Sequence, residues 1–264
     1  MSEELFRNLD NISRECSDFI RTTQHPMYRG MMRDGIFHVM SVREDRRPTV
    51  GQTTMDGPFR RFIYNYLVEK ETGIDRLRLR SVFMTGEIQE ARKYGNPYVI
   101  FPPNRSRFMV SEISDSISLL AGVFNAFKIE FNDALVRARA RDQEFSYVVE
   151  QYYRDGDEEV FRGTIDWDDN VERMDYLGPG GYGAMEDAIR ETQKSSTWKS
   201  HRPIEVETDQ LNYALRNGYE IMMFDTTYYY AILGEEMISG FGGDYMGSTE
   251  DAYANLLDMI EEGF

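Results

Sequence analysis

The sequence predicts an α+β protein, because short apolar runs of strand length alternate with stretches in which apolar residues recur every three or four positions. The clearest strand-like runs are 220–224 and 228–233, and the clearest helical stripe lies within 3–22. The chain has 264 residues, 41% of them hydrophobic, which is enough to bury a substantial core. We therefore expect one large domain, or one domain with an insertion.

In the first half of the chain, the predicted helices have recognisable ends. The helix over 3–22 stops before Pro26, because proline cannot continue a helix. A second helix opens at Asp56-Gly57-Pro58, with proline in its first turn, and ends at Gly73. A short helix carries Ile88 and Ala91. The strand-like runs of this half are 27–32, 36–40, 81–84 and 98–101.

The second half begins with helical signals and ends with two strands and a helix. Helices are expected over 114–153, 184–193 and 208–217, and after Ser248; strands are expected over 220–224 and 228–233, joined by a tight turn at 225–227. Thr208 and Ser248 are the predicted caps of two of these helices. Residues 155–175 are acidic and poorly periodic, and 178–183 predict a loop.

The charge of the chain limits its partners. The formal net charge is −16 and is spread along the sequence, so non-specific binding to DNA or RNA is not expected, whereas a basic partner would be favoured. The acidic residues could equally serve solubility alone. No apolar run reaches the roughly 18–20 residues of a membrane span, and the acidic N-terminus does not resemble a signal peptide. We expect no membrane association and a cytoplasmic, reducing location.

Several kinds of site can be set aside. Cys16 is the only cysteine, and the three histidines are far apart and outside any helical zinc motif, so no metal site is expected. No P-loop and no nucleophile elbow are present. The string Gly178-x-Gly180-x-x-Gly183 matches the dinucleotide fingerprint, but the segment before it is charged rather than a buried strand. We interpret this string as a plain turn.

Three polar residues on apolar strands are better candidates. Arg29 lies among apolar residues, where a guanidinium needs an acidic partner or a bound anion such as a diphosphate. Thr85 follows the strand 81–84, and Glu220 opens the strand 220–224. Each also has a purely structural interpretation: a buried ion pair for Arg29, a helix cap for Thr85 and a solvated strand end for Glu220.

Taken in order, these segments resemble the arginine–serine/threonine–glutamate motifs of the ADP-ribosyltransferases. Arg29-Gly30 corresponds to the first motif, Phe83-Met84-Thr85 to the second and Glu220-Ile221-Met222-Met223 to the third. The stretch 80–102 is also similar to bacteriophage proteins thought to share that fold. The resemblance covers roughly 25–103 and 208–233. It implies a single domain over 1–264 with a split mixed β-sheet, flanking helices and a mainly helical insertion at 104–200.

The resemblance also implies roles for individual residues, with NAD+ as the substrate that supplies ADP-ribose. Arg29 would hold the diphosphate or the nearby ribose, and the Gly30 backbone would bind the nicotinamide amide. Thr85 would position the glutamate or the ribose, and Tyr94 would stack on a ring. Glu220 would bind a ribose hydroxyl and stabilise the sugar cation as nicotinamide leaves.

The implied function is mono-ADP-ribosylation of a host macromolecule by a phage effector in the host cytoplasm. Gly218 stands where the arginine-modifying members carry Gln or Glu, so the acceptor is left open. The alternative is a catalytically silent protein that keeps the fold, either associated with the virion or acting as an acidic decoy of a basic host surface. The sequence leaves the oligomeric state and the role of 104–200 open.

Overall fold

We analysed a computed structural model of the chain, which describes residues 3–42, 57–74, 77–112, 178–234 and 248–262, and part of 122–137. The chain folds into two compact units. The first unit consists of Met1–Arg46, Leu77–Ser116 and Pro203–Phe264, and the second of Arg47–Arg76 and Ile117–Arg202. The acidic segment predicted at 155–175 lies outside the described residues.

The first unit contains two four-stranded sheets, which we call sheet A and sheet B. Sheet A has the order β1-β4-β8-β2 and sheet B the order β3-β7-β5-β6. The strands of sheet A are β1 (Tyr28–Met31), β4 (Asn96–Phe101), β8 (Tyr228–Leu233) and β2 (Phe37–Ser41). Those of sheet B are β3 (Val82–Met84), β7 (Glu220–Phe224), β5 (Arg107–Ser111) and β6 (Ile204–Val206). The α+β class is confirmed. Among the described residues, however, every strand pair is antiparallel, whereas we expected a mixed sheet.

Two helical segments of the first unit differ from the predictions. The helix expected over 3–22 is broken at Cys16 into α1 (Glu3–Glu15) and α2 (Ser17–Thr22). The turn η2 (Thr208–Gln210) before α11 (Leu211–Arg216) is capped by Glu207 through a capping box with Gln210, so the prediction of Thr208 as the cap is wrong. The described residues of this unit also form the helices α4 (Leu77–Arg80), α5 (Ile88–Arg92) and α13 (Thr249–Glu262).

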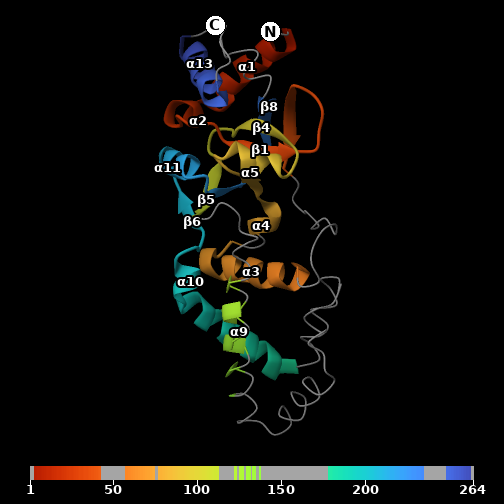
Figure 1. Cartoon of the computed structure of the whole chain (residues 1–264), viewed down its shortest axis with the longest axis vertical. Helices are drawn as coiled ribbons and strands as arrows, with labels where there is room; N and C mark the ends of the chain where they lie inside the picture. Colours follow the sequence, from red (N-terminus) through yellow and green to blue (C-terminus); the bar gives the residue numbers. More distant parts are fainter. Residues whose placement is uncertain are drawn as a thin grey trace. The chain divides into compact units, whose positions relative to one another are not determined.

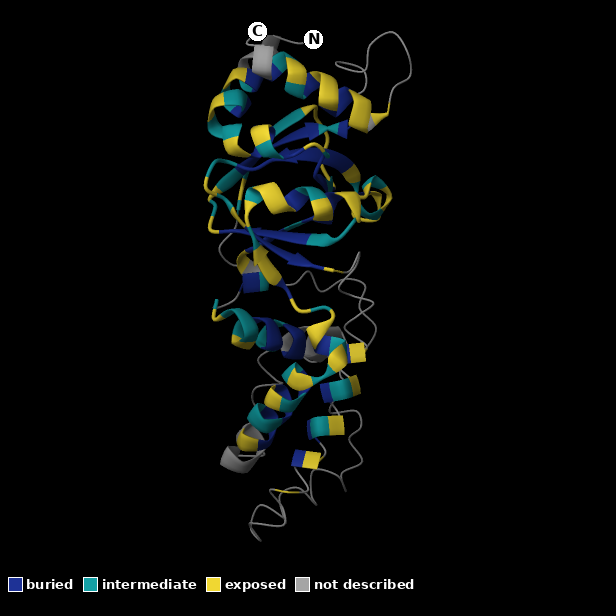
Figure 2. Cartoon of the chain, turned by 90° about the vertical axis from the view of Figure 1, so that its left-hand side faces the viewer, coloured by how far each residue is buried: buried dark blue, intermediate teal, exposed yellow. Residues whose placement is uncertain are grey.

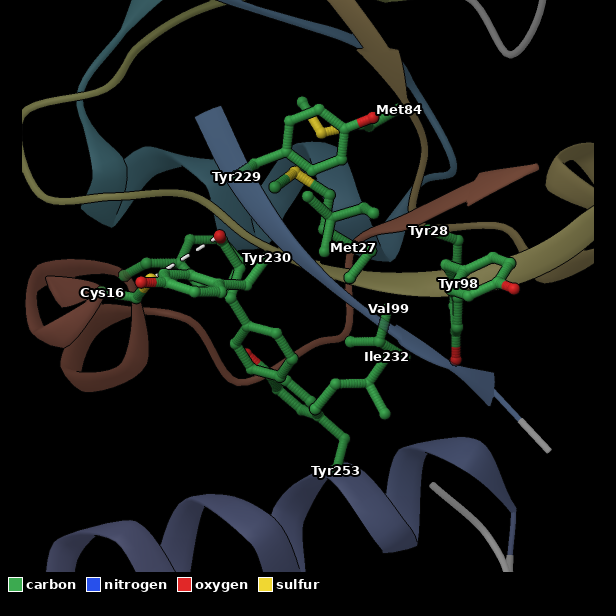
Figure 3. Packing of buried hydrophobic residues seen from close by; sticks show 14 of the residues in the cluster. Cys16, Met27, Tyr28, Met84, Tyr98, Val99, Tyr229, Tyr230, Ile232 and Tyr253 are labelled. Atoms are coloured by element: carbon green, nitrogen blue, oxygen red, sulfur yellow. Dashed lines mark hydrogen bonds between the residues drawn. The ribbon is translucent and has the colours of Figure 1, made fainter. Parts of the chain in front are cut away.

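Helices α1 and α13 cover one face of sheet A (Figure 1). On that side, Val99, Ile232 and Tyr253 pack together, and the Cys16 thiol donates to the carbonyl oxygen of Phe101 at 3.6 Å (Figure 3). The predicted cap of α13 is confirmed: the Ser248 hydroxyl oxygen accepts the Asp251 amide at 3.1 Å. The strands β4, β5, β7 and β8 are mostly buried, the edge strands β2 and β6 are not, and the helices show exposed outer faces (Figure 2).

The opposite face of sheet A turns toward sheet B. Tyr229 lies on that side together with Met27 and Met84, away from Tyr253 (Figure 3). Ile221 and Met223 of β7 belong to the same buried cluster. Because side chains alternate along a strand, Glu220, Met222 and Phe224 must lie on the other face of sheet B, which we call the outer face.

Two strands of sheet B were not predicted. β5 lies inside the segment 104–200, which we expected to be mainly helical, and it is central in the sheet because it pairs with both β6 and β7. β6 is a three-residue edge strand. The tight turn expected at 225–227 joins β7 of sheet B to β8 of sheet A, so the two strands that it connects do not form a hairpin.

The described part of the second unit is helical. It contains α3 (Gly57–Thr72), α9 (Gly178–Lys194) and α10 (Ser196–Lys199), and the described residues between 122 and 137 are helical too. The loop predicted at 178–183 is wrong, because α9 begins at Gly178; the glycine string is therefore part of a helix and not a dinucleotide-binding turn. Trp198 anchors this unit, with its indole N–H donating to Glu71 at 3.1 Å.

Candidate functional site

The three segments singled out in the sequence meet where the two sheets join. Tyr28 of β1 and Thr85, just after β3, exchange backbone hydrogen bonds of 2.7 and 3.0 Å. The Thr85 hydroxyl donates to the carbonyl oxygen of Gly218 at 3.2 Å and accepts the Glu87 amide at 3.1 Å. β1, the end of β3 and the start of β7 are thus directly connected through Thr85, which also supports the N-terminus of α5.

Glu220 lies at the start of β7, on the outer face of sheet B. Its Oε1 is 3.0 Å from Nη1 of Arg78, and the two side chains are only 13% and 14% exposed. The Arg78 guanidinium also lies 4.6 Å from the centre of the Phe83 ring. The carboxylate is therefore held in a largely buried ion pair rather than pointing into solvent.

Arg29 lies on the other side of sheet B. It is opposite Tyr98 in the β1–β4 ladder, and its guanidinium is 5.8 Å from the centre of the Tyr229 ring, on the face of sheet A that turns toward sheet B. The structure thus brings the backbone segments of Arg29, Thr85 and Glu220 together. The side chains of Arg29 and Glu220, however, lie on opposite faces of sheet B.

Gly30 and Tyr94 are close to each other. A Cβ atom at Gly30 would lie 1.9 Å from the Ala91 carbonyl oxygen and 2.9 Å from Cβ of Tyr94, so only glycine lets α5 pack this closely on β1. Tyr94 is 52% exposed. The N–H and C=O groups of Tyr28 both bond to Thr85, on the edge of β1 that faces away from β4. Along a strand these backbone groups point to alternate edges, so the N–H and C=O of Gly30 point to the same edge as those of Tyr28. A ligand amide could pair with the strand there.

The turn before Glu220 depends on Gly218. This residue has φ +65°, a left-handed conformation that glycine adopts without steric cost. Its amide donates to Leu215 at 3.1 Å and the Tyr219 amide donates to Ala214 at 3.0 Å, which satisfies carbonyls at the end of α11. Gly218 therefore ends the helix that leads into β7, as predicted from Asn217-Gly218.

Two aromatic residues, the exposed Tyr213 and the partly buried Tyr219, adjoin the start of β7. The rings of Tyr213 and Tyr219 meet edge to face with their centres 5.8 Å apart. A side-chain hydrogen bond with Tyr213, with a smaller effect of burial, raises the pKa of Tyr219 above its usual value. The shift strengthens the usual preference of the Tyr219 hydroxyl for its protonated form.

Two further residues of this region were missed by the sequence reasoning. Arg78 lies in the basic stretch 76–80, whose alternation of arginine and leucine was a usable signal. Ser111 is the Cα partner of Glu220 in the β5–β7 ladder, and it is fully buried. It could not be identified because β5 itself was not predicted.

The described residues give no sign of a metal site or a membrane span. Nowhere among them do three or more His, Cys, Asp or Glu side chains gather in an arrangement that could hold a metal ion. Of the helices that the structure describes, none is long and apolar enough to cross a bilayer. The candidate site described above consists of the Arg78–Glu220 pair, the hydroxyl groups of Thr85 and Ser111, and the free edge of β1 at Gly30.

Comparison with known proteins does not add to this picture. No protein-family model, no curated protein and no solved structure matches the chain.

Proposed function

We propose that this chain is a mono-ADP-ribosyltransferase, which transfers ADP-ribose from NAD+ to a host macromolecule. The observation that supports this proposal is the convergence of the three motif segments at the junction of sheets A and B. Arg29-Gly30, Thr85 and Glu220 come from strands far apart in sequence, and Thr85 links the other two segments through its backbone and its hydroxyl.

The reaction would break the bond between the nicotinamide nitrogen and the anomeric carbon of the ribose. Nicotinamide leaves with the electron pair of that bond, and its ring, cationic in NAD+, becomes neutral. An acceptor group then attacks the anomeric carbon and gives up its proton. Glu220 stabilises the cationic sugar between these events, since a carboxylate facing such a centre lowers its energy.

The remaining residues would bind NAD+. The outward-facing backbone of Gly30 suits the nicotinamide amide, and Tyr94, which is exposed beside it, can stack on a ring. Arg29 would bind the diphosphate, because its planar guanidinium matches two phosphate oxygens at once. This role requires NAD+ to reach both faces of sheet B, since the Arg29 and Glu220 side chains lie on opposite ones. Thr85 would hold the chain around Gly218 and so the position of Glu220.

A second candidate, a binding protein without turnover, is favoured by the position of Glu220. Its carboxylate pairs with Arg78 on the face of sheet B opposite to Arg29. In that case the net charge of −16 would serve recognition of a basic host surface. Such binding would weaken steeply with salt and would not depend on Arg29 or Glu220.

The experiment is transfer of label from adenylate-labelled NAD+ to proteins of a host lysate. We expect Glu220→Gln to reduce labelling about 100-fold or more, the size of effect seen when a group that stabilises transition-state charge is removed. Glu205→Gln is the matched control, because Glu205 is also a strand glutamate of sheet B paired with an arginine, but it is exposed.

The two candidates give different results in this assay. Labelling that persists in Glu220→Gln, or no labelling by the wild-type protein, would leave the binding protein as the function. Circular dichroism spectra of both variants establish that they are folded before labelling is compared.

A further inference from the structure

Ser111, the last residue of β5, is a buried polar group without an evident structural role. It is fully buried, and its hydroxyl has no hydrogen-bond partner in the part of the chain that the structure describes. An unpaired buried hydroxyl costs about 1–3 kcal/mol. Ser81, which is equally buried, shows the usual arrangement, since its hydroxyl donates to the Leu77 carbonyl at 2.6 Å. Ser111 is therefore available to a partner that the described residues do not supply.

The position of Ser111 indicates what that partner would contact. Ser111 lies directly opposite Glu220 in the β5–β7 ladder, so both side chains are on the outer face of sheet B. Side chains of such a pair have Cβ atoms about 4.5–5.5 Å apart. One oxygen atom can lie within a hydrogen bond, about 2.7–2.8 Å, of both the Ser111 hydroxyl and the Glu220 carboxylate.

Arg78 restricts the carboxylate at this position. Its Nη1 holds Oε1 of Glu220 at 3.0 Å, and the guanidinium in turn lies over the Phe83 ring, 4.6 Å from the ring centre. Glu220 and Arg78 remain 13% and 14% exposed, so the edge of the cluster is accessible to a ligand.

We propose that Ser111 is a ligand-contact residue of the Glu220 site, and that it binds a sugar hydroxyl of a nucleotide. The sugar hydroxyl accepts from the Ser111 hydroxyl and donates to Glu220, which as a carboxylate can only accept. Arg78 is the positioning residue that orients Glu220. This inference rests on the proposed function, because it takes Glu220 as the residue that binds the ribose of NAD+.

The test measures binding and stability of the full chain separately. By titration calorimetry, Ser111→Ala should bind ADP-ribose about 2- to 12-fold more weakly than wild type, the value of one hydrogen bond between neutral groups. The free protein should keep or slightly raise its thermal midpoint, because the removed hydroxyl had no partner. Ser81→Ala is the matched control for stability, and it should lower the midpoint, because it removes a hydroxyl that is paired.

Deoxy analogues of ADP-ribose identify the hydroxyl concerned. The analogue that lacks it should bind wild type and Ser111→Ala with equal affinity. If Ser111→Ala binds ADP-ribose as tightly as wild type, or is destabilised as much as Ser81→Ala, the inference is wrong while the proposed transfer activity stands. If Ser111→Ala weakens binding but the wild-type protein never transfers label, the inference stands and the transferase proposal fails. A wild-type protein that binds neither ADP-ribose nor NAD+ overturns both.

Discussion

The ion pair between Arg78 and Glu220 should be worth much more to stability than a closely similar pair in the same sheet. Arg107 and Glu205 are also an arginine–glutamate pair of sheet B, and they are closer, at 2.7 Å. Their side chains are 46% and 45% exposed, however, against 14% and 13% for Arg78 and Glu220. Arg107 also pairs with Asp225 at 2.7 Å, a contact whose effect a double-mutant cycle of Arg107 and Glu205 subtracts, so the two pairs can be compared for the effect of burial.

The expected magnitudes follow from this difference in exposure. Exposed ion pairs contribute about 0.2–1 kcal/mol, because water screens the charges and two flexible side chains must be ordered. Removing one partner of a buried pair costs about 3–5 kcal/mol, because the remaining charge is left unneutralised. Glu220 and Arg78 are slightly exposed, so we expect a coupling free energy of about 2 kcal/mol for this pair.

Double-mutant cycles measure both couplings. The variants are Arg78→Gln, Glu220→Gln and their combination, with Arg107→Gln, Glu205→Gln and their combination as the matched set. Because the chain has two units, the free energy of unfolding should be read from amide hydrogen exchange of β7 rather than from a global signal.

The reasoning would be refuted by equal couplings in the two cycles, or by a larger coupling for the exposed pair. Either result would mean that distance rather than burial decides the strength of these pairs. It would also remove the argument that Arg78 fixes the Glu220 carboxylate.

Two further predictions concern the stability of the chain. Tyr228 donates to Glu15 at 2.6 Å, and this hydrogen bond, with burial, raises the pKa of Tyr228 to about 12. Since an unfolded tyrosine has a pKa of about 10, the contribution of Tyr228 to stability should be constant below pH 10 and be lost as the pH rises from 10 to 12. Tyr230, which donates to the same Glu15 oxygen, also has a raised pKa and adds to the loss at high pH. The free energy of unfolding, measured by urea titration at several pH values, falls with pH in this range, and Tyr228→Phe should make that slope shallower by the equivalent of one proton. If the slope is the same in wild type and Tyr228→Phe, Tyr228 is not the group responsible. At Gly86 an added Cβ would lie 1.8 Å from the Leu215 carbonyl oxygen, so Gly86→Ala should cost about 3 kcal/mol. Gly183→Ala, in an open position of α9, should instead add about 0.5–1 kcal/mol, and similar thermal midpoints for both variants would contradict this account.

Local features of the chain could be predicted because they depend on neighbouring residues. The strands 220–224 and 228–233 were placed correctly from their apolar runs, since a strand of this kind must be buried whichever strand it pairs with. The cap at Ser248 and the helix end at Asn217-Gly218 were also correct, because both depend on backbone groups within a few residues.

Two segments were predicted wrongly or not at all, because their structure depends on contacts with distant parts of the chain as well as on neighbouring residues. The glycine string at 178–183 predicted a loop but starts α9. β5 was missed because its apolar run, 108–110, is short and directly precedes the segment 114–153, whose periodicity predicted helices.

The sequence by itself determined the class of this protein, the charge that restricts its partners, and which segments carry candidate site residues. Only the tertiary structure decided which strands join at Thr85, that Ser111 stands opposite Glu220, and that Glu220 and Arg29 lie on opposite faces of sheet B. The physical reason is that strand pairing forms hydrogen bonds between residues far apart in sequence, and a shift of one residue in register exchanges the faces of a sheet. The partner of Glu220 could therefore not be read from the residues next to it.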